Sequence, residues 1–371
     1  MVLVHLQKAK VSDVNSLVSG YAKQKMFKKI PVIGGLRQNI EGFRKKFASK
    51  AAILMYHRVI DMDADPWSLC VSPQYFAEHL DILRKYAHPI SLQQLVLAHK
   101  DGKIPERAVA VTFDDGYADN LHNAKPLLAQ YSVPATVFVA NGALGQAREF
   151  WWNELERILL QPGTLPETLE LNIKHEPFCW VLGKDSDYSE DAYQRDCGWI
   201  VDLQKYPTSR HSLYFTLHQL LQPLPDAEVY QVMDELLAWS GKKTVPFSIN
   251  RTLSKKELLL LKQGELITIG AHTVTHPSLS ILSKSRQQDE IIQNKIVLEE
   301  YLGQRVNLFA YPYGKYSMQT RTIVQEAGFA CACTIDKNCV WHGSDPYLLP
   351  RITMKDWEGE NFLKQLNPIL K

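Results

Sequence analysis

The chain lacks an excess of charge, a long apolar run and an N-terminal signal sequence. Its 42 Lys and Arg residues against 40 Asp and Glu residues give a formal net charge of +2, so no overall field favours nucleic acid. No segment approaches the roughly 18 apolar residues of a membrane-spanning helix. Residues 1–15 have neither the continuous apolar core nor the small-residue cleavage site of a signal peptide. We therefore expect a cytoplasmic protein with no nucleic-acid partner.

The six cysteines show no paired spacing that would hold a structural metal ion. Cys331 and Cys333 are too close together for a C-x-x-C knuckle, and they lie in the strand-like segment Phe329 to Ile335. Buried, reduced thiols are the expectation, in keeping with a cytoplasmic location.

What the chain has is size and a globular composition. With 371 residues, 45% hydrophobic and 22% charged, it can form one large α/β domain with appendages. Strand-like and helix-like segments alternate, which implies parallel strands with outer helices. The expected strands are Ala52–Met55, Val109–Phe113, Thr136–Val139, Ile267–Gly270, Leu308–Tyr311 and Ala330–Ile335, and the expected helices are Pro73–Tyr86, Ala124–Tyr131, Lys255–Gln263, Lys284–Leu302 and Gln319–Ala327.

The string Thr112-Phe113-Asp114-Asp115-Gly116-Tyr117 ends one of these strands. Adjacent residues of a regular strand point to opposite faces, but Gly116 permits a kink that lets both carboxylates converge on one pocket. One carboxylate can then bind a divalent ion while the other stays free as a base.

The string His272-Thr273-Val274-Thr275-His276 follows another strand and places two imidazoles four positions apart. On a helical turn that spacing puts both on one side. Two His and one carboxylate leave coordination positions open, which is typical of a catalytic metal site. On its own, an Asp-Asp-Gly string is more often a turn, and a His-x-x-x-His string is more often a chance pair of surface histidines. Because each string here follows a strand, the two together favour a hydrolytic site.

With these two strings the chain resembles the polysaccharide deacetylase family, the carbohydrate esterases of family 4. The family motifs T-F-D-D-G and H-[ST]-x-x-H are both matched without a substitution. The resemblance implies a distorted (β/α) barrel of about seven parallel strands. It also implies that Asp114 is the general base and that Asp115, His272 and His276 bind the metal.

A third family motif, R-x-P-[FY]-G, is matched in part by Ala310-Tyr311-Pro312-Tyr313-Gly314. In the family the Arg holds the base, and here that position is Ala310. The backbone N–H of Tyr313 can still serve as an oxyanion donor. A Pro-Tyr-Gly string on its own would be an ordinary turn. The side chains that we expect near the substrate are Tyr117, Trp151, Trp152, Tyr311 and Pro312.

The family's C-terminal Leu-x-His, which provides the general acid, has no convincing match; the nearest histidine is His342, in a loop. His57 is a better candidate, because it ends the buried-strand pattern of residues 51–59 and resembles the acid of the permuted poly-N-acetylglucosamine deacetylases. The alternative is a core histidine bonded to the backbone. Arg351 could supply the cation that Ala310 does not.

The distance between the motifs predicts an insertion. Asp115 and His272 are 157 positions apart (272 minus 115), more than one or two βα units need. We expect a catalytic domain of residues 51–149 and 247–357, a largely helical insertion of residues 150–246, and a C-terminal tail of residues 358–371. Because Trp151 and Trp152 cannot both face inward from one helix, one of them should be a pocket residue that stacks on a sugar.

Residues 1–50 form a basic N-terminal extension. Residues 22–50 contain nine Lys and Arg and a single acid, Glu41. Leu36, Ile40, Phe43 and Phe47 fall at helical spacing, so we expect a short basic amphipathic helix. It either packs on the catalytic domain or attaches to an anionic membrane surface, at the inner face of the membrane.

Three functions are compatible with these features. The first is a metal-dependent de-N-acetylase acting on an N-acetylated sugar of a surface polysaccharide or its lipid-linked precursor. The second is an amidase of the same fold with a non-sugar substrate. The third is a glycan-binding protein without turnover. For the metal we expect Zn²⁺, although Co²⁺, Mn²⁺ or Fe²⁺ also suits a site of two nitrogens and one oxygen.

Overall fold

The computed structural model describes residues 49–203, 205–245 and 249–370. The basic amphipathic segment expected within residues 22–50 therefore lies almost entirely outside the described residues. Within them, no helix is both long and apolar enough to cross a membrane.

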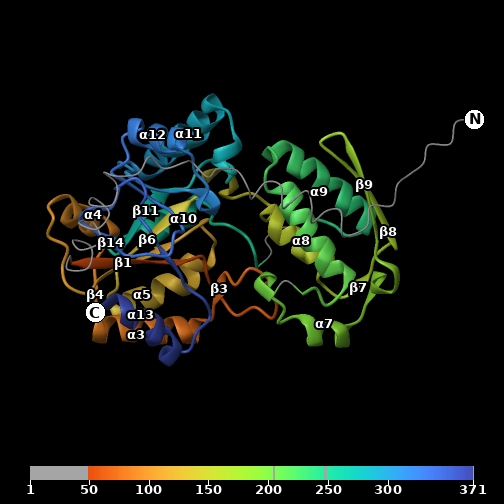
Figure 1. Cartoon of the computed structure of the whole chain (residues 1–371), viewed down its shortest axis with the longest axis horizontal. Coiled ribbons are helices and arrows are strands. Elements are labelled where there is room, and N and C mark those ends of the chain that lie inside the picture. The colour runs from red at the N-terminus through yellow and green to blue at the C-terminus, as the bar shows by residue number, and fades with distance from the viewer. Residues whose placement is uncertain (1–48, 204, 246–248, 371) are drawn as a thin grey trace, which may run out of the picture.

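The wall of the main domain is a curled sheet of parallel strands (Figure 1). Its order is β13-β12-β11-β6-β5-β1-β14, and β14 (Val340–Trp341) is antiparallel to β1. The short strand β4 (His88–Pro89) pairs with β5 off this path. The parallel strands are β1 (Lys50–Tyr56), β5 (Ala108–Phe113), β6 (Ala135–Val139), β11 (Ile267–Ala271), β12 (Leu308–Ala310) and β13 (Cys331–Cys333).

The segment after β14 closes this sheet into a barrel. β15 (Ile352–Thr353) runs parallel to β1, and Leu349 forms a parallel bridge with Cys333 of β13. Residues 349–353 thus contact both edges of the curled sheet, and Arg351 lies between the two contacts. The expected distorted barrel is confirmed, except that β14 runs antiparallel.

Side chains on the two faces of each strand enter different cores. Ala51 and Ile53 point into the barrel, whereas Ala52 and Leu54 pack against the outer helices, as the two-residue period of a strand requires. Six residues of this interior core are small, which leaves room for a few large side chains. The small residues are Ala51, Ala108, Ala110, Ala310, Cys331 and Cys333. All six cysteines of the chain are free, and these two are buried as expected.

Helices cover the outside of the barrel (Figure 1). Several begin at a serine whose hydroxyl accepts from a backbone N–H of the first turn, such as Ser72, Ser254 and Ser283. The helices are α3 (Pro73–Tyr86), α4 (Leu92–Lys100), α5 (Lys125–Tyr131), α10 (Lys255–Lys262), α11 (Lys284–Leu302), α12 (Met318–Glu326) and α13 (Gly359–Leu370). Leu92 and Leu95 of α4 join the interior core.

The C-terminal residues are not a tail, contrary to our expectation. They form α13, which lies beside α3, and its Phe362 and Leu366 are buried in the core between helices and sheet. Phe362 stacks on His79 of α3 with a ring distance of 4.0 Å. The apolar spacing of four residues places both side chains on one face of the helix.

The insertion forms a second body with its own core. Its helices are α6 (Trp151–Leu159), α7 (Glu190–Asp196), α8 (Ser209–Leu221) and α9 (Asp226–Ser240), and its strands are β7 (Gly163–Thr164), β8 (Thr168–Ile173), β9 (Glu176–Val181) and β10 (Asp187–Tyr188). The hairpin of β8 and β9 was not expected. The two ends of the insertion meet where Gly145 N–H donates to the Leu253 carbonyl (3.0 Å). A chain that leaves and returns at one point can fold a separate core without disturbing the barrel.

Candidate active site

The motif residues gather at one end of the barrel. Asp114 and Asp115 follow β5, His272 follows β11, and His57 follows β1. Because these strands are parallel, their C-terminal ends lie on the same rim, which is where (β/α) barrels carry their functional groups.

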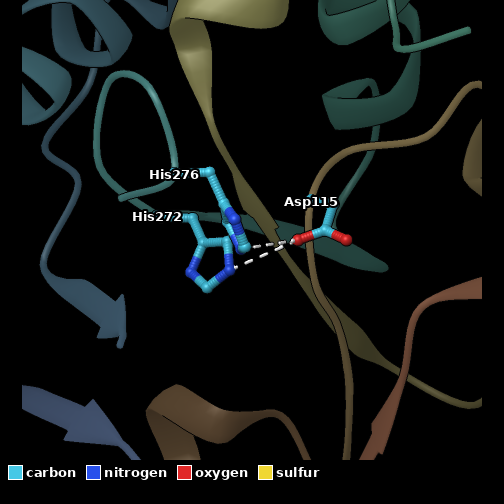
Figure 2. Close-up of side chains that lie close together, drawn as sticks. All are labelled: Asp115, His272 and His276. Atoms are coloured by element: carbon cyan, nitrogen blue, oxygen red, sulfur yellow. Dashed lines mark ion pairs between the residues drawn. The ribbon is translucent and has the colours of Figure 1, made fainter. Parts of the chain in front are cut away.

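Asp115, His272 and His276 lie close enough together to bind one ion (Figure 2). The Asp115 Oδ1 atom is 3.4 Å from His272 Nε2 and 3.2 Å from His276 Nε2, and all three side chains are buried. Burial raises the pKa of Asp115, but the two imidazoles outweigh it and hold the pKa well below its ordinary value. The carboxylate therefore stays charged.

These three residues fit a divalent metal. Asp115 Oδ1 is buried and receives no hydrogen bond from any described residue, an arrangement that is costly unless a cation supplies the missing partner. His272 Nδ1–H donates to the Ala310 carbonyl (2.8 Å), which fixes the tautomer and leaves the lone pair of Nε2 facing Asp115. Two nitrogens and one oxygen suit zinc and several related ions.

The backbone of the site is strained at two of the three ligands and at two residues near them. Asp115, Thr273, His276 and Tyr313 have left-handed φ angles of 74°, 69°, 60° and 55°, each a cost of about 1 kcal/mol or more for a residue with a Cβ atom. The kink expected at Gly116 (φ 79°) thus begins one residue earlier.

This early kink separates the two carboxylates. Asp114 N–H still donates to the Tyr56 carbonyl of β1 (3.1 Å), so Asp114 continues the strand while Asp115 leaves it. Adjacent carboxylates consequently face different partners.

Two polar residues of α11 hold the metal-binding loop in place. Glu290 accepts from the backbone N–H groups of Val274 and Thr275, both at 2.9 Å. Asn294, one turn further on, accepts from His272 N–H (3.1 Å) and donates to the Thr273 carbonyl. These bonds offset the strain of the left-handed residues. The sequence analysis did not identify Glu290 and Asn294. Their spacing of four positions in the predicted helix, which puts both polar side chains on one face, could have indicated them.

Arg351 lies against Asp114. Its Nη1 and Nη2 atoms donate to the two carboxylate oxygens, both at 2.7 Å, and its Nε donates to the Thr334 carbonyl at 2.9 Å. Burial raises the pKa of Asp114, but the charge of Arg351 outweighs it, so the pKa lies below its ordinary value. The fully buried guanidinium also lies over the ring of Phe138 (5.6 Å) inside the barrel. The Arg351 side chain thus lies in the barrel interior, where the small side chain of Ala310 leaves room for it.

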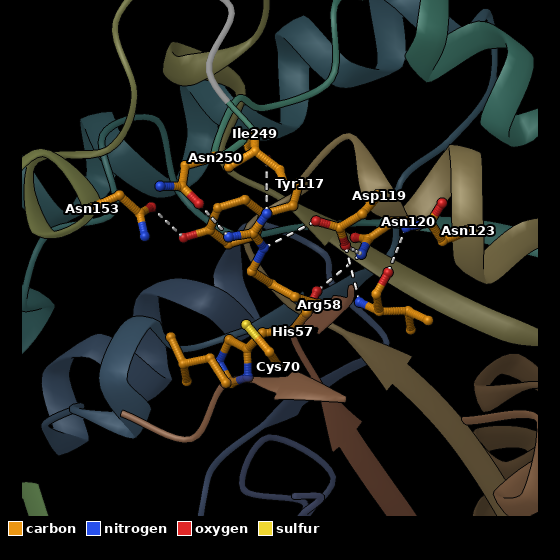
Figure 3. Close-up of polar contacts among 12 residues, drawn as sticks. His57, Arg58, Cys70, Tyr117, Asp119, Asn120, Asn123, Asn153, Ile249 and Asn250 are labelled. Carbon is orange, nitrogen blue, oxygen red and sulfur yellow. Dashed lines mark hydrogen bonds and ion pairs between the residues drawn. The ribbon is translucent and has the colours of Figure 1, made fainter. Parts of the chain in front are cut away.

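His57 ends β1 at the same rim and is half-buried. Its backbone carbonyl accepts from Asn120 Nδ2 (2.9 Å) (Figure 3). The neighbouring Arg58 donates to Asp119 (2.9 Å) and to Asn250 (2.6 Å), which fixes the strand end that carries the imidazole. A protonated His57 also lowers the pKa of both Asp114 and Asp115, so it lies within electrostatic reach of them.

His342 lies at the other end of the barrel. β14 pairs with the first residues of β1, Lys50 with Trp341, whereas His57 follows the last. Because a strand advances about 3.3 Å per residue, His342 is roughly 20 Å from the rim that carries Asp114. Of the two candidate acids, the structure brings only His57 to the site.

One aromatic residue of the insertion and one of the partly matched third motif line the metal site. Trp152 and Tyr313 contact the His276 ring at 5.0 and 4.5 Å. Trp151 and Trp152 are 5% and 6% exposed, so both face inward, and the premise that they cannot both do so from one helix is wrong. Both can be buried because α6 is packed between the rim of the barrel and the core of the insertion.

Three other residues expected at the substrate have packed side chains. The Tyr311 hydroxyl donates to the Tyr347 carbonyl (3.0 Å) within the main core, and Pro312 next to it is buried. The buried Tyr117 donates to Asn153 Oδ1 (2.9 Å) and accepts from Trp152 Nε1 (2.9 Å). These three side chains pack beneath the site. Because they are buried, they offer no surface on which a sugar could stack.

Comparisons with known proteins agree with this geometry. A family model described as polysaccharide deacetylase matches residues 101–163 and 207–332. The YxkH protein of Bacillus subtilis (strain 168), whose name describes a polysaccharide deacetylase, is 20% identical over 310 residues, covering 82% of this chain and 71% of that protein. The poly-beta-1,6-N-acetyl-D-glucosamine N-deacetylase of Escherichia coli (strain K12) is 36% identical over 84 residues, 22% of this chain and only 12% of that protein.

Solved structures share the fold. The deacetylase PplD of Streptococcus pyogenes, in complex with acetate, has a TM-score of 0.53 and 19% identity, with 86% of this chain and 99% of that chain covered. IcaB from Ammonifex degensii has a TM-score of 0.54 and 17% identity, with 87% and 98% covered. At these identities the likeness concerns the fold alone.

Proposed function

Since the chain belongs to the polysaccharide deacetylase family, we propose that it is a metal-dependent hydrolase that removes the N-acetyl group from an N-acetylated sugar. The observation that carries this proposal is the division between two adjacent carboxylates. Asp115 faces two imidazoles, and Asp114 faces a guanidinium. One fits a ligand and the other a base, which is the pair of roles that hydrolysis of an amide needs.

Asp115, His272 and His276 would hold a divalent ion, for which Zn²⁺ is our first choice. When bound, such an ion supplies Lewis acidity towards the amide carbonyl. The three residues leave the remaining coordination positions to water and substrate.

The chain's own groups would then move the protons. Asp114, oriented by Arg351, takes a proton from the attacking water. The backbone N–H of Tyr313 donates to the oxygen that becomes negative in the transition state. His57 returns a proton to the leaving amine, which is a poor leaving group without one.

For the substrate we propose an N-acetylated glycan of the cell surface or its lipid-linked precursor. The segment shared with the E. coli poly-N-acetylglucosamine deacetylase supports the choice of an N-acetylated sugar. We further propose a cytoplasmic location, with residues 22–50 contacting an anionic membrane. Liposome flotation of the chain with and without residues 1–50 tests the contact, and equal recovery of the two forms contradicts it.

Acetate release from N-acetylated oligosaccharides tests the function. We expect release that stops on chelation and returns with Zn²⁺, Co²⁺, Mn²⁺ or Fe²⁺. Release of acid only from non-sugar amides would identify an amidase instead. Sugar binding by the metal-loaded protein without acetate release would identify a glycan-binding protein.

A further inference from the structure

The two histidines of the metal site are held in different ways. A ligating imidazole usually donates its second ring N–H to an acceptor, which fixes the plane of the ring. His272 does so, since its Nδ1–H donates to the Ala310 carbonyl at 2.8 Å. The Nδ1 atom of His276 is buried and has no hydrogen-bond partner among the described residues. The backbone N–H of His276 donates to Thr273 Oγ1 (3.1 Å), but this bond fixes the loop and not the ring.

Two aromatic side chains pack against the His276 ring instead. The centroid of the Tyr313 ring lies 4.5 Å from it, and that of the Trp152 ring lies 5.0 Å from it. Tyr313 belongs to the loop after β12, whereas Trp152 belongs to α6, the first helix of the insertion. Because a close-packed side chain can turn only by displacing its neighbours, these contacts restrict rotation of the imidazole about its Cβ–Cγ bond.

Trp152 is itself held from two sides. Its Nε1–H donates to the Tyr117 hydroxyl (2.9 Å), and its indole stacks on Phe150 with ring centroids 4.3 Å apart and 11° between the planes. The Tyr117 hydroxyl in turn donates to Asn153 Oδ1 (2.9 Å; Figure 3), so two consecutive residues of α6 hold one hydroxyl group of the barrel. Tyr117 lies two positions after Asp115. The indole is thus tied to the loop of one metal ligand and packs on the ring of another.

We propose that Trp152 is a positioning residue for the metal ligand His276, and that the insertion thereby forms part of the metal site. The indole does for His276 what the Ala310 carbonyl does for His272, since it sets the plane of the imidazole so that Nε2 faces the ion. The inference rests on the metal ligands of the proposed function. It adds to them a residue that lies outside the two strings that carry the ligands.

The test measures metal binding by the full chain. Competition with a chelator gives the affinity, and the absorption spectrum of the Co²⁺-loaded protein reports the geometry of the ligands. We expect Trp152→Leu to lower the affinity by about tenfold, the lower end of the range for groups that orient metal ligands, and to change the Co²⁺ spectrum. Trp152→Phe keeps an aromatic ring beside His276, so it should retain more of the affinity than Trp152→Leu.

Trp199→Leu is the matched control. Trp199 is also a buried tryptophan in the core of the insertion, 5% exposed, and its Nε1–H also donates one hydrogen bond, to the Lys205 carbonyl at 2.8 Å. Its ring packs on Tyr214 and His211, neither of which is a proposed metal ligand. The two Leu variants therefore remove the same group from the same core, and only one of them removes it from beside His276.

Tyr117→Phe reaches the same indole without changing it. The substitution removes the hydroxyl that accepts from Trp152 and keeps the ring of Tyr117. We expect a loss of metal affinity in the same direction as for Trp152→Leu, but smaller. If Trp152→Leu does not fold, this variant decides, and an affinity equal to that of the unsubstituted chain contradicts the inference.

Equal metal affinities and equal Co²⁺ spectra in Trp152→Leu and Trp199→Leu would overturn the positioning role, as would an unsubstituted chain that binds no divalent metal. The test needs no substrate. An unsubstituted chain that binds the metal but releases no acetate therefore contradicts the proposed function alone, and a tenfold weaker affinity in Trp152→Leu would still support the role of Trp152.

Discussion

The site has two halves that are built in different ways. The metal-binding half consists of Asp115, His272 and His276, with left-handed backbone at Asp115 and His276, and it is held by polar side chains of the adjacent helix α11. The proton-transfer half consists of Asp114 and His57 on regular strand ends. It is held by an arginine from the far end of the chain and by the network around Arg58. The first half depends on local geometry, and the second on long-range pairing.

The largest effect should follow from removing the acid of the proton-transfer half. We expect His57→Gln to lower kcat for an N-acetyl sugar by about 10³-fold, within the range of a general acid. The variant should keep its metal. An activated aryl acetate, whose leaving group needs no proton, should lose far less. Equal losses on amide and ester would show that His57 is not the acid.

The next largest effect should follow from breaking the pair of Asp114 and Arg351. Both groups are buried, so Arg351→Met leaves an unpaired charge and should lower the free energy of unfolding by about 3–5 kcal/mol. Turnover should fall with it, because the base loses its orientation. Urea denaturation and kcat of the same preparation check this, with Arg351→Lys as the variant that retains a charge. Unchanged stability and turnover would contradict the pairing.

A smaller effect should follow from loosening the metal-binding half. Glu290→Gln keeps its shape but weakens the acceptor for Val274 and Thr275, and we expect a metal affinity about 10-fold to 100-fold lower, as for other groups that orient metal ligands. Competition with a chelator measures it. Glu300→Gln, at a surface position of the same helix, is the control. An affinity equal to that of the control would remove Glu290 from the metal-binding half.

The smallest effect should come from an ion pair outside both halves. Glu257 accepts from Arg251 twice at 2.7 Å, and these hydrogen bonds hold the pKa of Glu257 below its ordinary value. A lowered folded-state pKa stabilises the protein above the unfolded value, and this gain is lost as the pH falls through the folded one. The pair is partly exposed, so Arg251→Gln should cost only about 1 kcal/mol at neutral pH.

The cost of Arg251→Gln should shrink in acid. Denaturation at pH 7 and at about pH 3, below the ordinary pKa of a glutamate, measures the difference between the two forms. A cost that is the same at both pH values would mean that the pair does not stabilise the folded state through its charge.

The same contrast explains what could be predicted from the sequence. Helices α3 and α11 have the bounds expected from the sequence, and the strands agree within two residues. The strings around Asp115 and His272 are local, so their meeting at one rim follows from parallel strands. The pairing of Arg351 with Asp114 spans 237 positions, and it could be suggested only because Ala310 left a cation missing.

What could not be predicted depends on packing between distant elements. The burial of both Trp151 and Trp152 requires the insertion to press α6 onto the barrel, which no periodicity within α6 indicates. The hairpin of β8 and β9 and the helix α13 lie at the periphery, where short patterns are ambiguous. The contacts of Glu290 and Asn294 depend on the exact rotation of α11 over a loop that is not regular structure.

The division of roles between the two adjacent carboxylates is tested most directly by measuring metal content and acetate release in Asp114→Asn and Asp115→Asn side by side. We predict that Asp114→Asn binds metal in the same amount as the unsubstituted chain and loses turnover by about 10³-fold. Asp115→Asn should lose the metal itself. Loss of metal from Asp114→Asn, or turnover close to that of the unsubstituted chain in either variant, would contradict the account.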